Sequence, residues 1–260
     1  MKDNNYWKEH YVTVSNVEEI ATNIQRTNFI SRQISYELVY FEKDKSAPNI
    51  LISEGTGGHA YVFAELAYCM FLLGYNVFIM PQHGTATIAE LMERHRDAIK
   101  HIGSKFSERV GVFGEGLGGY AVFYLALAGF PIKSMAFQNS PAILNEKKFQ
   151  EAFSVGKGAG KRRKMILPIA KVLAKIFPAL PLPISTYLDF EELIDSKKEN
   201  RDIETRLVVN GYLCDPDFVK WNPLFTIMSL VSTPQPGLLE NIITPTMFIV
   251  PLRGIYPEYE

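Results

Sequence analysis

The 260-residue sequence has few cysteines, no long apolar run and almost no excess of charge. Its two cysteines, Cys69 and Cys214, are too few for a disulfide framework. No stretch approaches the roughly 18 apolar residues that span a membrane, and the first seven residues lack the apolar core of a signal peptide. The net charge of −1 gives no overall field that would attract nucleic acid. These absences predict a cytoplasmic protein with no transmembrane segment and no nucleic-acid partner.

What the sequence does contain is the composition of an ordinary globular protein. Apolar residues make up 47% of the chain and charged residues 21%, and 260 residues are enough for one large domain with a buried core. No cluster of side chains has metal-ligand spacing. Residues 156–161 lack both the spacing and the Ser or Thr of a phosphate loop. We therefore expect no cofactor and no metal.

Short apolar runs alternate with helical patterns along most of the chain. The expected strands cover residues 9–15, 32–42, 49–52, 75–80, 110–113, 131–138 and 243–250. The expected helices cover residues 61–73, 88–102 and 117–129. Thr87 and Glu90 have the spacing of a capping box at the start of the second helix. Strands that alternate with helices predict an α/β fold with a mostly parallel sheet.

Residues 140–240 interrupt this alternation. They contain many prolines, a basic cluster at 161–164 and a long apolar run after it. We expect residues 1–139 to form the core, residues 140–240 a helical cap, and residues 241–260 the last strand with the start of a helix. Apolar residues share one helical face within 161–177, which fits either a cap helix packed on the core or a lid that touches an amphiphilic substrate.

The most informative stretch is residues 109–120, where a β-branched apolar run is followed by a glycine-dense turn and a long apolar helix. Gly114 and Gly118 flank this turn, and Gly119 allows the helix to pack closely on the strand. Strand, tight turn and helix form the context of a nucleophile elbow. With Gly116 in place of the usual serine at the apex, the stretch resembles the Gly-x-Ser-x-Gly-Gly elbow of α/β-hydrolases.

The resemblance extends over most of the chain and is greatest to the esterase and monoacylglycerol-lipase type. Residues 55–58, Gly-Thr-Gly-Gly, are similar to the oxyanion loop of that family. The resemblance implies that the backbone N–H groups of Thr56 and Leu117 converge on a developing oxyanion. It also implies an acyl ester or another small apolar molecule as the ligand.

Three positions depart from the family pattern. Gly116 has no nucleophilic atom, and the loop around Gly254 has no Asp or Glu where the resemblance implies the catalytic acid. The sequence also stops before the place where the family has its general-base histidine. We expect a chain that does not hydrolyse esters by the serine mechanism. We also expect the strand ending near Val250 to be a sheet edge that invites a homodimer.

Several side chains are candidates for the rim of the site. Gly55, Gly57, His59 and His83 lie in loops after strands, where open α/β sheets bind ligands. The two histidines either line the mouth of a pocket or bond backbone groups. Glu115 is expected to point away from the apex as an outer hydrogen-bonding group. Asp215 and Asp217 fit a turn or helix cap, or an approach to the mouth from the cap. Cys69 is expected in the core, whereas His95 and His101 are expected to be ordinary helix or surface residues.

Two functions fit these observations. In the first, the chain is a carboxylic ester hydrolase altered at Gly116 and at its C-terminal segment. In the second, it is a natural non-catalytic relative that binds a small apolar ligand or a protein partner. Fold analogy alone does not choose between them.

Overall fold

The computed structural model describes residues 17–81, 83–84, 86–138, 140, 169, 172–184, 215 and 217–249. Its centre is a seven-stranded sheet with the strand order β1-β2-β4-β3-β5-β6-β9. The strands are β1 Gln25–Ser31, β2 Ile34–Phe41, β3 Asn49–Ser53, β4 Asn76–Ile79, β5 Val110–Glu115, β6 Ser134–Gln138 and β9 Thr246–Ile249. The pairs β1·β2 and β2·β4 are antiparallel, and all other pairs in this sheet are parallel. The prediction of a mostly parallel α/β sheet is confirmed.

The first hairpin of the sheet differs from the prediction. The partner of β2 is β1, in the register Ser31↔Ile34, and not residues 9–15, which lie outside the described residues. Arg32 and Gln33 join the strands with φ values of 50° and 64°, as a tight hairpin turn requires. The sequence of β1 has only two apolar residues among seven, so its periodicity gave no strand signal.

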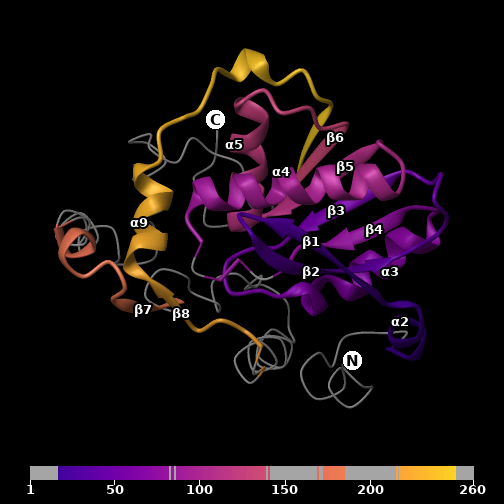
Figure 1. Ribbon diagram of the computed structural model, residues 1–260, viewed down its shortest axis with the longest axis horizontal. Coiled ribbons are helices and arrows are strands. Elements are labelled where there is room, and N and C mark those ends of the chain that lie inside the picture. Colours follow the sequence, from indigo (N-terminus) through magenta and orange to yellow (C-terminus); the bar gives the residue numbers. More distant parts are fainter. Residues whose placement is uncertain are drawn as a thin grey trace, which may run out of the picture.

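Helices cover both faces of the sheet (Figure 1). One face packs against α4 Ile88–Lys105 and α5 Gly116–Leu127, and the opposite face packs against α2 Val17–Asn23, η1 Ala60–Phe63 and α3 Ala64–Leu72. The predicted capping box of Thr87 and Glu90 begins α4. Eleven of the twelve residues of α5 are buried, which explains why this helix is apolar on all sides.

A long segment separates β6 from its neighbour β9. Its described parts include the two-stranded pair β7 Pro181–Pro183 and β8 Trp221–Pro223, followed by α9 Leu224–Ser232 and η3 Leu239–Asn241. Helix α9 meets α4 where the backbone N–H of Ile88 donates to Ser229 Oγ at 3.3 Å. Of the predicted apolar face within 161–177, the described Ile169 and Ile176 are exposed.

Strand β9 is the last strand at its side of the sheet among the described residues, and β6 is its partner there. Met247 and Phe248 are 56% and 54% exposed, although both are large and apolar. Residue 250 and those after it lie outside the described residues. In the described part of the chain, none of the helices has the length and hydropathy required to cross a bilayer.

Candidate functional site

The turn between β5 and α5 has the geometry of an elbow. Gly116 is the first residue of α5 and has φ +48°, the left-handed region in which a side chain costs roughly 1–2 kcal/mol. A Cβ at Gly116 would have one neighbour within 4 Å, Gly55 Cα at 3.3 Å. Strand β5 and helix α5 approach each other closely here. A Cβ at Gly114 would lie only 2.6 Å from Gly119 Cα, so the approach requires glycine at this position. The apex therefore has a backbone conformation that glycine adopts without strain and other residues do not, and Gly55 lies close above it.

The loop after β3 is held against this elbow. The backbone N–H of Gly118 donates to the carbonyl oxygen of Glu54 at 3.0 Å. Leu117 is in the first turn of α5, where backbone N–H groups have no partner within the helix. Thr56 lies in the same loop, between Gly55 and Gly57. The two segments that carry the expected oxyanion donors are thus neighbours.

Two glutamates lie beside the elbow. A Cβ at Gly55 would be 1.9 Å from Glu115 Oε2, so the carboxylate of Glu115 lies against the glycine loop. Glu54 is fully buried, and neither of its carboxylate oxygens has a hydrogen-bond partner. Burial and the nearby carboxylate of Glu115 raise the pKa of Glu54 well above its ordinary value. Glu54 therefore holds a proton more tightly than an exposed glutamate does.

His83 is buried beneath the same loop. Its Nε2–H donates to the carbonyl oxygen of Glu54, which leaves Nδ1 as an acceptor that is buried and has no partner. Burial, together with the neighbouring His95, lowers the pKa of His83 to about 3. This contact with a backbone group matches one of the two alternatives for His83. The neutral imidazole cannot supply a positive charge to the site at neutral pH.

A second buried histidine forms a pair with a serine. His95 Nδ1–H donates to the carbonyl oxygen of Leu91 at 2.6 Å, so its Nε2 accepts from the hydroxyl of Ser53 at 2.5 Å. Both side chains are fully buried, and burial lowers the pKa of His95 to about 4. His95 is a helix residue, one of the two expected alternatives, but it is buried and not on the surface. Because Ser53 is fully buried, its hydroxyl is not placed to attack a substrate, and the pair supports the loop.

His59 joins the glycine loop to the segment before β8. Its Nε2–H donates to Asp215 Oδ2 at 2.7 Å, and its Nδ1 accepts from the backbone N–H of Tyr61 at 3.3 Å. Asp215 Oδ1 also accepts from the backbone N–H of Asp217 at 2.9 Å, so this aspartate both forms a turn and reaches the rim. The N–H of Val219 donates to the carbonyl oxygen of Gly57 at 3.0 Å.

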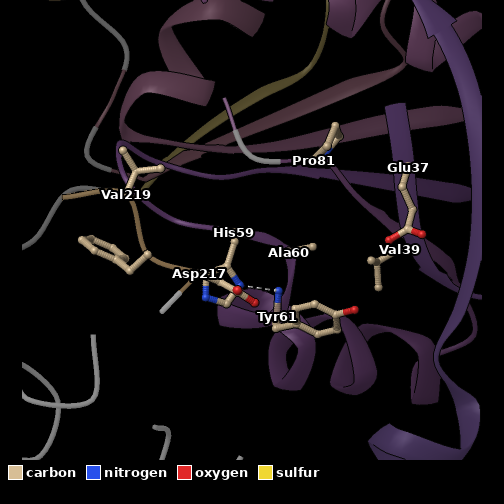
Figure 2. A pocket seen from close by; sticks show the side chains of 9 residues that line it. Glu37, Val39, His59, Ala60, Tyr61, Pro81, Asp217 and Val219 are labelled. Carbon is tan, nitrogen blue, oxygen red and sulfur yellow. Dashed lines mark hydrogen bonds between the residues drawn. The ribbon is translucent and has the colours of Figure 1, made fainter. Parts of the chain in front are cut away.

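A pocket of about 470 Å³ opens beside His59 (Figure 2). Its walls come from β2, from the start of η1, from Pro81 after β4 and from residues 217–219. Gly116, Thr56 and Leu117 are not among the lining residues. The pocket is therefore next to the glycine loop but separate from the elbow.

Neither a scan against protein-family models nor a search of the curated proteins finds a match. Solved structures do match. A monoacylglycerol lipase of Paleococcus ferrophilus has a TM-score of 0.57 and 20% identity, over 87% of this chain and 77% of that one. DcsB in complex with its substrate analogue has a TM-score of 0.62 and 17% identity, over 90% and 82%. The α/β hydrolase GrgF of Penicillium sp. sh18 has a TM-score of 0.60 and 14% identity, over 88% and 80%. The chain has the α/β-hydrolase fold.

The α/β-hydrolase fold places most of the predicted site residues at one rim of the sheet. Gly55 lies in the loop after β3, His83 in the loop after β4, and Gly116 directly after β5, and these three strands are parallel. Their carboxyl ends therefore meet at the same edge. Gly254, the position near the expected acid, lies outside the described residues. In the part of the chain that the structure describes, no three His, Cys, Asp or Glu side chains are grouped as metal ligands would be.

The sequence patterns did not identify Glu54 or the pair of Ser53 and His95, and they placed Cys69 on the wrong face of its helix. Glu54 was not considered, although it directly precedes Gly55 at the end of a strand, the signal that identified His83. Ser53 and His95 are 42 residues apart and no pattern links them. Cys69 is exposed, contrary to the prediction that it is in the core. All residues of α3 except Glu65 are apolar or aromatic, so periodicity could not show which face of α3 is buried.

Proposed function

We propose that this α/β-hydrolase-fold protein is of the carboxylic ester hydrolase type and binds an acyl ester at the elbow without hydrolysing it by the serine mechanism. The observation that carries the proposal is Gly116, at φ +48° between β5 and α5, where the chemistry requires a serine. Gly116 has no atom that can attack a carbonyl carbon. A Cβ at Gly116 would meet one atom within 4 Å, Gly55 Cα at 3.3 Å, so the ligand would approach from the sides that the glycine loop does not occupy.

The backbone supports binding of the ester carbonyl. In this proposal, the N–H groups of Thr56 and Leu117 donate to the carbonyl oxygen, with Gly55 and Gly57 giving the loop its shape. The hydrogen bond from Gly118 to Glu54 holds the two segments together. First-turn amides of a helix favour negative charge, which is the charge that develops on this oxygen. His59 and His83 would contribute to substrate binding at the rim of the sheet, and Gly254 would lie near the position where the family has its catalytic acid.

A second candidate is a natural non-catalytic relative that binds a small apolar ligand or a protein. The glutamates favour it. The carboxylate of Glu115 lies against Gly55, and the carboxyl of Glu54 is buried beneath the loop. The negative charge of Glu115 beside the amides opposes a developing oxyanion, because like charges within a few ångströms repel. The site then keeps the shape of a hydrolase while its electrostatics disfavour the reaction.

Two features of the remaining chain complete the proposal. Residues 140–240 would form a cap, since they connect the neighbouring strands β6 and β9 and contact the glycine loop through Val219.

The edge of β9, with its exposed apolar side chains, would pair with a second copy of the chain, as unpaired strand edges do. Light scattering tests the dimer, and a strictly monomeric chain would contradict it. The cytoplasmic location stays a prediction.

The proposed function is tested with aryl esters and a non-hydrolysable analogue. We expect no hydrolysis of p-nitrophenyl butyrate above the protein-free rate. We also expect butyranilide, an amide analogue of the ester, to raise the melting temperature of the chain by binding the folded state. Gly116→Val should abolish this shift by filling the space above the elbow.

Gly74→Val is the matched control, because Gly74 also has a positive φ, +101°, and a Cβ there would meet nothing within 4 Å. It should keep the shift. Ester turnover that disappears on changing Gly116 or His83 would contradict the vacant nucleophile. A complete lack of stabilisation by butyranilide would count against acyl binding at the elbow.

A further inference from the structure

The glycine loop after β3 is bonded at two points to the segment before β8, residues 215 and 217–219. His59, at the end of the loop, donates its Nε2–H to Asp215 Oδ2 at 2.7 Å, and both side chains are buried. Two residues earlier, the carbonyl oxygen of Gly57 accepts from the N–H of Val219 at 3.0 Å. Figure 2 shows the segment that carries Val219 passing beside His59. The loop is therefore attached to a part of the chain that is 156 residues away in sequence.

Gly57 is tightly enclosed between the loop and this segment. It has φ +85°, and a Cβ there would lie 2.8 Å from Phe218 Cζ, 2.9 Å from Ile184 Cδ1 and 2.9 Å from the carbonyl oxygen of Val219. Close packing of this kind restricts the backbone, because any shift of the loop must displace these atoms. Thr56 directly precedes Gly57. The same contacts therefore limit the movement of Thr56, whose N–H is one of the two expected oxyanion donors.

The carboxylate of Asp215 serves both sides of this attachment. Its Oδ2 accepts from His59 in the loop, and its Oδ1 accepts from the backbone N–H of Asp217 at 2.9 Å. One oxygen thus holds the loop while the other shapes the turn that follows Asp215. An asparagine has one carbonyl oxygen and an NH₂ group in place of the second oxygen. In the same geometry, it could accept from His59 or from Asp217 but not from both.

We propose that Asp215 is a positioning residue for the ligand site at the elbow. Acting through His59, it fixes the glycine loop so that the N–H of Thr56 meets the carbonyl oxygen of the ligand. A hydrogen bond to a charged group is directional, and breaking it in the interior leaves a buried polar group without its partner, so the bond favours one arrangement of the loop. This role rests on the proposed function, because it concerns a donor to the acyl group.

Hydrogen exchange of the full chain tests the attachment without any ligand. In Asp215→Asn, the amides of Val219 and Gly58 should exchange at least roughly tenfold faster, because the loop and the segment before β8 separate more often. The N–H of Gly58 reports on the loop, since it donates to the carbonyl oxygen of Gly55 at 3.4 Å. The amide of Met80, which donates to the neighbouring strand of the sheet at 2.9 Å, should keep its rate.

Two ligands of the same length separate positioning from general damage to the fold. Butyranilide has a carbonyl oxygen, and N-butylaniline has a methylene group in its place. Asp215→Asn should raise the Kd of butyranilide roughly three- to tenfold, which corresponds to about one hydrogen bond, and leave the weaker binding of N-butylaniline unchanged. Asp217→Asn is the matched control, because it makes the same change on an exposed side chain of the same segment. It should change neither the affinities nor the exchange rates.

The unchanged chain provides a test that does not depend on the variant. If one opening exposes both amides, Gly58 and Val219 should have protection factors that agree within about threefold. Widely different protection, unchanged exchange in Asp215→Asn, or equal losses of affinity for the two ligands would each overturn the positioning role. If the unchanged chain binds butyranilide no more tightly than N-butylaniline, the proposed function fails, and the exchange rates alone then decide whether Asp215 fixes the loop.

Discussion

Replacing Gly118 with alanine is expected to destabilise the chain by about 3 kcal/mol or more. A Cβ at this position would lie 2.0 Å from Ser53 Oγ, 2.5 Å from the carbonyl oxygen of Glu54 and 2.8 Å from the carbonyl carbon of Ser53. The last two atoms belong to the backbone, so no rotation of a side chain relieves the overlap. Overpacking that forces the backbone to shift costs roughly 1–3 kcal/mol, and the hydrogen bond from Gly118 N–H to Glu54 would weaken as well. Guanidinium unfolding measures the loss.

The same substitution at Gly103 should have the opposite sign. Gly103 lies inside α4, and a Cβ there would have one neighbour within 4 Å, at 3.8 Å. Alanine is favoured over glycine in a helix interior by about 1 kcal/mol, so Gly103→Ala should stabilise the chain by roughly that amount. Both residues are helical glycines, and the contrast isolates the contact between α5 and the loop after β3. A Gly118→Ala variant as stable as the unchanged chain would refute that contact.

The second large effect is the loss of stability in acid. His83 and His95 are neutral and buried, with pKa values of about 3 and about 4 against an ordinary 6.5. Below pH 6.5 the unfolded chain binds protons at these residues and the folded chain does not. Their contribution to stability is therefore complete above pH 6.5, and each loses about 1.4 kcal/mol per pH unit as the pH falls toward the folded-state pKa.

Glu54 works in the opposite direction. Because its folded-state pKa is raised, the unfolded chain releases this proton above pH 4.5 while the folded chain keeps it. Stability then falls as the pH rises from 4.5 to the folded-state pKa.

Two variants separate the contribution of the buried histidines to stability from that of Glu54. Relative to the unchanged chain, His95→Gln should be less stable at pH 7 and recover about 1.4 kcal/mol per pH unit below 6.5. Glu54→Gln should gain stability as the pH rises above 4.5.

Guanidinium unfolding of the three chains from pH 4.5 to 8 measures these slopes. Opposite slopes for His95→Gln and Glu54→Gln support the protonation states assigned to the site. Parallel curves for all three chains would mean that neither side chain is buried as described. A gain in stability on replacing Glu54 is also the usual sign that a residue is kept for function, since functional groups often destabilise the fold.

The fold could be predicted from the sequence because its strongest signals are local. Residues 110–115 form a mostly buried strand, and Gly114 is required by its close approach to Gly119 within the same turn. Likewise, Thr87 and Glu90 determine the start of α4 within four residues. Periodicity and glycine spacing report on such short-range requirements directly.

The site was harder to predict because its contacts join distant parts of the chain. His59 and Asp215 are 156 residues apart, and Ser53 and His95 are 42 apart. Tertiary packing also decides which face of a largely apolar helix is buried, so Cys69 in α3 was misplaced. The direction of Glu115 depends on the glycine loop that it contacts. None of these features is encoded in the spacing of neighbouring residues.

A cysteine at residue 116 tests whether this residue occupies the nucleophile position of a hydrolase elbow. In a chain with Cys69 and Cys214 changed to serine, Gly116→Cys should be acylated by p-nitrophenyl butyrate. The thiolate attacks the carbonyl carbon, p-nitrophenolate leaves, and a thioester forms once per chain. Mass spectrometry of Gly116→Cys and of the control Gly74→Cys gives the two rates. We expect acylation at residue 116 to be at least about a hundredfold faster than at residue 74. The N-terminus of α5 would lower the pKa of the thiol, and the oxyanion amides would stabilise the developing negative charge. Equal rates at the two positions would contradict it.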